Sequence, residues 1–143
     1  MTTARKQLKG QLQKPGQRTE TVSITVDDSE SLNYRIRHRN VSSASGTLSL
    51  DISTANSFAC TLTENITTID VNGAMVTDQY WEFNLRLVQH ASAAKTVAWA
   101  AKFHFPNGVD HVMSTAVDSV DSIHGYSVDG GTIWDCTFAL ASA

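Results

Sequence analysis

The stretch SVDGGTIWDCTF, residues 127–138, predicts a β-hairpin and with it the fold class. Asp129, Gly130 and Gly131 supply the turn, because residues that tolerate positive φ suit the tight turns whose twist matches two antiparallel strands. After the turn, apolar side chains alternate with polar ones, which indicates a half-buried strand. The inward positions of this strand are expected to be Trp134, Cys136, Phe138 and Leu140.

Short alternating segments of the same kind precede the hairpin. They lie at residues 21–26, 34–39, 47–52, 58–62, 66–71, 81–88, 97–99, 103–105 and 120–128. Turn residues such as Asn72-Gly73 separate them, and no stretch of roughly 11 to 18 residues has a helical period. The sequence therefore predicts an all-β fold, an antiparallel β-sandwich or jelly-roll-like domain. Gly125 interrupts the last of these segments, and a β-bulge is expected there.

The size and composition of the chain indicate one globular domain. The chain has 143 residues, which is enough for one domain with a core and too few for two ordinary ones. Hydrophobic residues make up 41% and charged residues 17%, as in globular rather than disordered proteins. We expect a single β domain over residues 21–143, preceded by an arm over residues 1–20.

The first 20 residues are predicted to form an extended basic arm. They hold five basic residues against Glu20 alone, a charge of +4, and since the whole chain carries −3 the remainder carries −7. Such a segment suits contact with an acidic neighbouring surface, although a frayed, solvated terminus accounts for the same composition. The basic side chains expected to contact a partner are Arg5, Lys6, Lys9, Lys14 and Arg18.

A second basic feature is the arginine row of residues 34–39. Arg35, Arg37 and Arg39 alternate with other side chains, so an extended strand would place them on one face. Guanidinium groups match phosphates, but the acidic remainder of the chain argues against nucleic acid. Two interpretations remain: ion pairs to an acidic subunit surface, or a solvated edge strand that prevents aggregation.

The cellular compartment of the protein is predicted from the absence of a signal peptide and of a membrane-spanning segment in this sequence. The start has no apolar core of signal-peptide length, and no later run reaches the roughly 18 apolar residues of a membrane span. Assembly in a cytoplasm without a membrane partner is expected. Cys60 and Cys136 fall at inward strand positions, so reduced, buried thiols are the expectation and a disulfide between them the alternative.

From residue 80 onward the succession of motifs resembles a β module of tailed-bacteriophage virion proteins, found in tail fibres and other minor structural proteins. That module runs from an aromatic strand through Thr-apolar-Thr-Trp-Pro and Trp-Pro-Gly-Gly to a closing Asp-Gly-Gly-Thr-Thr-Trp. The matching positions are Thr96, Trp99, Pro106, Gly108, Asp121, Asp129, Gly130, Gly131, Thr132 and Trp134. The likeness departs at Ala100, which replaces Pro, and at His104-Phe105, which replaces a second Trp.

This resemblance implies a non-enzymatic structural protein of a bacteriophage particle, assembled in the host cytoplasm and located in the virion. In a chain this short it implies a capsid-decorating or cement protein that docks on the major capsid protein or other virion proteins. A homo-oligomer, trimer or dimer, is expected. The alternative is a tail-fibre or head-appendage module that binds a host receptor or glycan.

The sequence contains no catalytic motif. A nucleophile elbow, a phosphate-binding loop and a zinc-protease helix are all lacking, so no enzyme and no cofactor are expected. The nearest approach to a metal-binding set is His104, Asp110, His111, Asp121 and His124. Strand positions scatter such side chains to opposite faces, and no metal is expected.

Aromatic residues are the remaining candidates for ligand contact. Trp81 and Trp134 are expected in the core, while Trp99 is left open between core and surface. For a glycan-binding module, the residues expected to face the ligand are Trp99, His104 and His111.

Overall fold

The computed structural model describes residues 5–8, 22–25 and 37–142. The chain divides into two units, Met1–Arg35 and Ile36–Ala143. In the first unit, β1 (Arg5–Leu8) pairs antiparallel with β2 (Val22–Thr25), Leu8 standing opposite Val22. The strand predicted at residues 21–26 is thus confirmed as β2.

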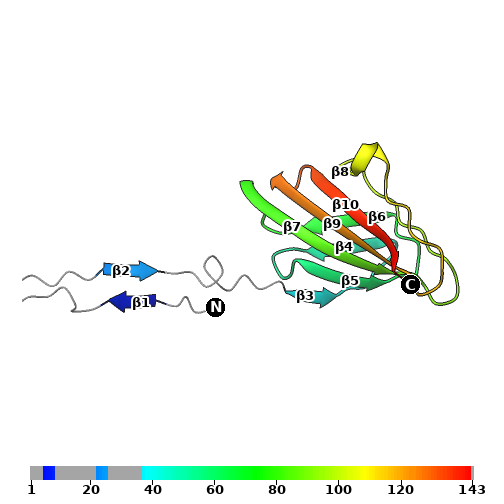
Figure 1. The fold of residues 1–143 in the computed structure, drawn as a ribbon, viewed down its shortest axis with the longest axis horizontal. Coiled ribbons are helices and arrows are strands. Elements are labelled where there is room, and N and C mark those ends of the chain that lie inside the picture. Colours follow the sequence, from blue (N-terminus) through cyan, green and yellow to red (C-terminus); the bar gives the residue numbers. More distant parts are fainter. Residues whose placement is uncertain (1–4, 9–21, 26–36, 143) are drawn as a thin grey trace, which may run out of the picture. The chain divides into compact units, whose positions relative to one another are not determined.

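The second unit is all-β, as predicted, and contains two sheets (Figure 1). Six strands form one sheet in the order β3-β5-β7-β9-β10-β8, and two form the other, β4-β6. Their bounds are β3 His38–Asn40, β4 Thr47–Asp51, β5 Ser57–Thr61, β6 Thr68–Asn72, β7 Thr77–Val88, β8 Phe103–His104, β9 Val120–Asp129 and β10 Trp134–Ser142. A single 3-10 turn, Pro106–Gly108, follows β8.

The expectation of purely antiparallel sheets is wrong. β7, β9 and β10 are antiparallel to one another, but β3-β5, β5-β7, β8-β10 and β4-β6 pair in parallel. From β3 to β7 the chain passes alternately from one sheet to the other. Within this part of the chain, each strand therefore pairs with the strand two places later in the sequence, and the two run in the same direction.

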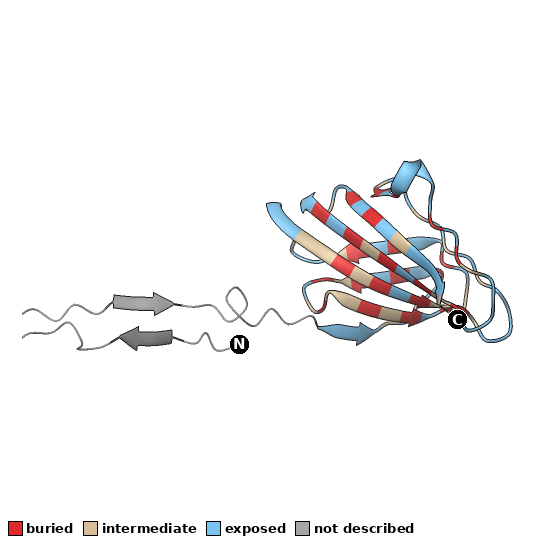
Figure 2. Ribbon diagram, in the orientation of Figure 1, coloured by how far each residue is buried: buried red, intermediate tan, exposed pale blue. Residues whose placement is uncertain are grey.

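The two sheets bury one shared core. In Figure 2 buried and exposed residues alternate along the strands, as the period-two sequence pattern predicts. Leu48, Leu50, Ile69 and Val71 of the smaller sheet belong to the same cluster as the buried side chains of the larger sheet, which include Phe58, Cys60, Phe83, Leu85, Leu87, Ile123, Trp134 and Cys136. One face of the six-stranded sheet thus packs on β4 and β6, and its other face remains outward.

The hairpin between β9 and β10 forms as the sequence predicts. Gly130 and Gly131 have φ of 71° and 84°, in the left-handed region that favours glycine. The Asp129 carboxylate accepts hydrogen bonds from the Ser127 hydroxyl at 2.7 Å and the Ile133 amide at 3.0 Å. These bonds, that of Ile133 foremost, hold the pKa of Asp129 below its usual range.

Two details of the predicted strands are wrong. Leu140 was expected inward with Trp134, Cys136 and Phe138, but it is 56% exposed because the register of β10 shifts between Ala139 and Ser142. Such a shift places the following side chains on the opposite face. Residues 97–102 form no strand, and only Val97 makes an isolated bridge, to Ile66.

The β-bulge expected at Gly125 is absent, and the glycine has another role. Its register against Phe83 of β7 and Cys136 of β10 is regular. A Cβ at this position would lie 2.5 Å from Cε1 of Phe83 and 3.1 Å from Sγ of Cys136. Gly125 therefore leaves the space that the Phe83 ring occupies.

We expect Gly125→Ala to lower the free energy of unfolding by about 1–3 kcal/mol, the usual cost of overpacking a filled core. Urea denaturation followed by circular dichroism measures the change. Ser122→Ala is the matched control, because Ser122 lies on the same strand with its side chain exposed, and it should change stability by less than about 0.5 kcal/mol. Equal stability of the two variants would contradict the packing role.

The two cysteines are free, buried thiols on the core face. Burial raises the pKa of Cys136 to about 12, and the neighbouring Asp135 charge adds to the effect. Burial also raises the pKa of Cys60, with a backbone hydrogen bond of Ser43 acting in the opposite direction. Both thiols are therefore protonated at neutral pH and pack as small apolar groups.

Candidate binding surface

The loop residues predicted to face a ligand divide between surface and core. His104, on β8, is exposed. Trp99 is half-buried, and its ring meets those of Phe103 and Phe105 edge-on, with centroids 5.2 and 4.9 Å apart. Trp99 therefore packs at the rim of the core.

His111 does not face a ligand, contrary to the prediction, because it is 1% exposed. Its Nδ1 accepts a hydrogen bond from Nε1 of Trp99 at 3.3 Å, and its Nε2 lies 2.7 Å from Oδ2 of Asp121. The indole N–H can only donate, so Nδ1 is the acceptor and Nε2 donates to the carboxylate. The imidazole is thereby fixed between Trp99 and Asp121.

Asp121 joins three segments of the chain at one buried carboxylate. Besides His111, its Oδ2 accepts from the Ser114 amide at 2.8 Å, and its Oδ1 accepts from the Ala141 amide at 2.8 Å. Burial disfavours the charged form, but the Ala141, Ser114 and His111 hydrogen bonds outweigh it and lower the pKa of Asp121. The carboxylate thus holds the end of β10 and the loop after the 3-10 turn onto β9.

The candidate metal set does not assemble. His111 and Asp121 meet, but no third His, Cys, Asp or Glu joins them in a metal-binding group anywhere in residues 5–8, 22–25 and 37–142. The pair is buried, its imidazole is bonded to Trp99, and its carboxylate is also bonded to the side chain and the amide of Ser114. The hydrogen bonds of this pair stabilise the fold by joining the loop after the 3-10 turn to β9 and β10. We call this pair the buried clamp.

The predicted basic contacts lie mostly outside the described residues. This holds for Lys9, Lys14, Arg18 and Arg35, and for Arg5 and Lys6 only the backbone of β1 is described. Arg37 and Arg39 are exposed, and Arg39 lies on β3, an edge strand of the six-stranded sheet. Their exposure agrees with either interpretation of the arginine row.

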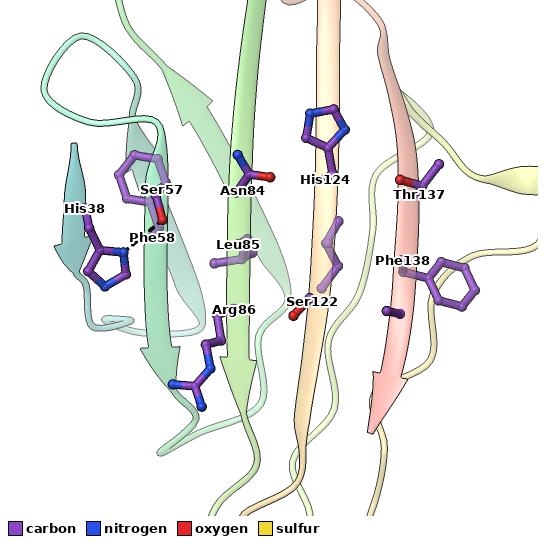
Figure 3. A pocket seen from close by; sticks show the side chains of 12 residues that line it. His38, Ser57, Phe58, Asn84, Leu85, Arg86, Ser122, His124, Thr137 and Phe138 are labelled. Carbon is purple, nitrogen blue, oxygen red and sulfur yellow. Dashed lines mark hydrogen bonds between the residues drawn. The ribbon is translucent and has the colours of Figure 1, made fainter. Parts of the chain in front are cut away.

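A trough of about 440 Å³ crosses the outward face of the six-stranded sheet (Figure 3). Five polar residues stand side by side in it, one on each of the neighbouring strands β3, β5, β7, β9 and β10. Each of these residues is paired in register with the next. They are His38, Ser57, Asn84, His124 and Thr137. Within this polar row, Nδ1 of His38 lies 2.9 Å from Oγ of Ser57.

Arg86 stands beside the polar row, in the next register line. Its neighbours there are Ala59 on β5 and Ser122 on β9, both small, with Ala139 beyond them on β10. The guanidinium group is exposed and makes no ion pair with any carboxylate of the described residues. Figure 3 shows it projecting over the sheet toward β5.

A tyrosine stack borders the other side of the polar row. The rings of Tyr80 and Tyr126 lie 5.5 Å apart and nearly parallel. Oε2 of Glu82 accepts from the Tyr80 hydroxyl at 3.3 Å and lies 3.1 Å from Nε2 of His124. This network ties the stack to the row.

Sequence reasoning missed this surface. It placed Glu82, Asn84 and Arg86 outward, but it could not align them with residues of other strands, because register is a tertiary property. The sequence did contain one signal for this surface, the kind of residue at outward positions. These positions carry Ser, Thr, Asn and His with one isolated Arg, whereas solvated strands commonly carry Lys and Glu.

Comparisons of the chain with protein-family models, curated proteins and solved structures found no match. In the part of the chain that the structure describes, no helix is long and apolar enough to span a membrane.

Proposed function

We propose that the chain is a non-enzymatic structural protein of a bacteriophage particle, most simply a capsid-decorating protein located in the virion and assembled in the host cytoplasm. Its partners would be the major capsid protein or other virion proteins, and a further copy of itself in a dimer or trimer. No nucleic acid and no membrane are part of the proposal. The fold proposed for its second unit is a β-sandwich of two unequal sheets.

The observation that carries this proposal is the separation of charge. The basic residues 1–20 precede an acidic remainder, and they belong to the first unit, Met1–Arg35. Complementary charge directs association between proteins and fixes its orientation. A basic N-terminal segment is therefore suited to holding an acidic β domain on an acidic coat surface.

The structure gives the resembling module positions folding roles, which agrees with a structural protein. Gly130 and Gly131 form the hairpin turn, Trp134 is fully buried, and Asp121 belongs to the buried clamp. Trp134 and Asp121 are both 0% exposed, so their side chains serve the fold and not a substrate.

We expect replacement of Arg5, Lys6, Lys9, Lys14 and Arg18 by glutamine to weaken attachment to particles by at least tenfold, because the charge of residues 1–20 falls from +4 to −1. Co-sedimentation of the purified chain with particles that lack it measures the affinity. Wild-type binding should weaken with added salt, since salt screens exposed charges. Undiminished decoration by the glutamine variant would overturn the proposal.

The trough supports a second candidate, a tail-fibre or head-appendage module that binds a host receptor or glycan. Three residues were expected to serve this function: His111 is buried, Trp99 packs at the rim of the core, and His104 is exposed. The polar row and Arg86 offer a better surface, because their hydrogen-bonding groups face outward on a rigid sheet.

A further inference from the structure

We propose that the trough binds a saccharide carrying a carboxylate, with Arg86 pairing the carboxylate and the polar row binding the sugar hydroxyls. This inference rests on the second candidate function, and it names the ligand's chemistry and the residues that would recognise it.

Arg86 provides the charge complementarity. An arginine fork binds a carboxylate through two parallel hydrogen bonds, and it is most effective when no protein carboxylate already occupies it. Ala59 and Ser122 beside it are too short to cover the guanidinium group, and no described carboxylate pairs with it. Among the residues that line the trough, Arg86 thus presents an exposed positive charge with no carboxylate partner among the described residues.

The polar row matches a ligand rich in hydroxyl groups. Hydroxyl, amide and neutral imidazole side chains each donate and accept hydrogen bonds, as sugar hydroxyls do. Five consecutive strands about 4.8 Å apart give the row a length of roughly 19 Å. This is an extended site that lies across the strands, and its trough of about 440 Å³ has the volume of a small-ligand site.

Other ligand classes fit the trough less well. Nucleic acids are held by several cationic side chains along the phosphate backbone, whereas among the described residues Arg86 is the only Lys or Arg that lines the trough. Peptides are held chiefly by apolar anchors in pockets. The large apolar residues beneath the row, Phe58, Leu85 and Ile123, are at most 2% exposed and belong to the core.

The tyrosine stack extends the site beyond the polar row. Tyr80 is 58% and Tyr126 37% exposed, and Tyr126 follows His124 by two residues on the same face of β9. Since two stacked rings leave outer ring faces free, the apolar face of a sugar ring could pack there. A saccharide longer than one residue would then contact both the stack and Arg86.

The test uses the full-length chain and soluble sugars. Isothermal titration calorimetry with oligogalacturonate, a sialylated oligosaccharide, methyl-esterified oligogalacturonate, a neutral hexose oligomer, a heparin oligosaccharide and a poly-glutamate peptide compares the ligand classes. Binding of either carboxylated sugar, with clear loss on esterification, is expected, and the first two ligands distinguish uronic from sialic acids. Equal binding of the ester, or preference for heparin or poly-glutamate, would overturn the proposal, as would the absence of binding to both carboxylated sugars.

Variants locate the site. Arg86→Gln should weaken binding between about 10-fold and 150-fold, which corresponds to loss of a charged hydrogen bond, and Arg86→Lys should fall between it and the wild type. Ser122→Tyr should also weaken binding by filling the trough. Lys95→Gln removes the same charge outside the trough lining and should bind like the wild type. Equal binding by Arg86→Gln and Lys95→Gln would contradict the proposed site.

The result is independent of particle attachment. Free sugars require neither coat protein nor residues 1–20, so the glutamine variant of those residues should bind the carboxylated sugar normally. Loss of particle attachment with sugar binding retained separates the two functions, and failure of sugar binding leaves the coat-docking proposal to its own test.

Discussion

Asp121→Ala is expected to lower the free energy of unfolding by about 3–5 kcal/mol, the range found when one partner of a buried polar pair is removed. The carboxylate is 0% exposed and accepts from the Ser114 and Ala141 amides and from His111. Its removal leaves the buried His111 donor and the part-buried amides of Ser114 and Ala141 without this acceptor. Urea denaturation measures the loss.

Asp121→Asn is the sharper variant of the same test. A carboxylate accepts at both oxygens, whereas an amide accepts at one side and donates at the other. Asparagine can still accept from the Ala141 amide, but its NH₂ group would then face the donors of Ser114 and His111. We expect this nearly isosteric change to cost more than about 1 kcal/mol. A negligible cost would show that Asp121 fills space and does not act as an acceptor.

The same carboxylate gives a pH dependence with a definite sign. Its pKa is lowered in the folded state, so its stabilising contribution is complete above the unfolded value of about 3.9 and is lost as pH falls through the folded value. The wild type should lose stability steeply on acidification below about pH 4. Asp121→Asn, compared by urea denaturation at several pH values, should depend less on pH there.

Sequence periodicity predicted most of the strands because inward and outward residues alternate along a half-buried strand. The burial of Thr47–Asp51 and of Val120–Asp129 follows this alternation. Strand direction was not predictable in this way, because alternation is the same in parallel and antiparallel pairs. The passage of the chain between the two sheets decides direction, and it depends on packing of the whole core.

In the candidate site, too, the features of a single strand could be predicted and those that depend on several strands could not. The outward position of Asn84 could be predicted from β7 alone, but its alignment with His124 and Thr137 depends on the registers of three strands. His111 was predicted to face a ligand because it lies in a polar loop, and its burial depends on Asp121, ten residues away. Gly125 was interpreted from backbone rules, whereas Phe83, on another strand, explains it.

Trp134→Ala is expected to lower the free energy of unfolding by about 3–5 kcal/mol, as for other large core aromatics. Trp134 is 0% exposed, and its ring meets that of Phe83 edge-on with centroids 5.2 Å apart. Ile133→Ala is the matched control, because the adjacent Ile133 is 39% exposed and should cost less than about 1 kcal/mol. Similar losses from both variants would contradict a central packing role for Trp134.

Trp134→Phe separates packing from hydrogen bonding at this site. Nε1 of Trp134 has no hydrogen-bond acceptor among the described residues, and a buried polar group without a partner is unfavourable. Phenylalanine removes that N–H, which should raise the free energy of unfolding, but it leaves a small cavity, which should lower it. We therefore expect Trp134→Phe to cost less than half as much as Trp134→Ala. A loss as large as that of the alanine variant would indicate that the indole N–H stabilises the folded state, contrary to the packing role argued for this side chain.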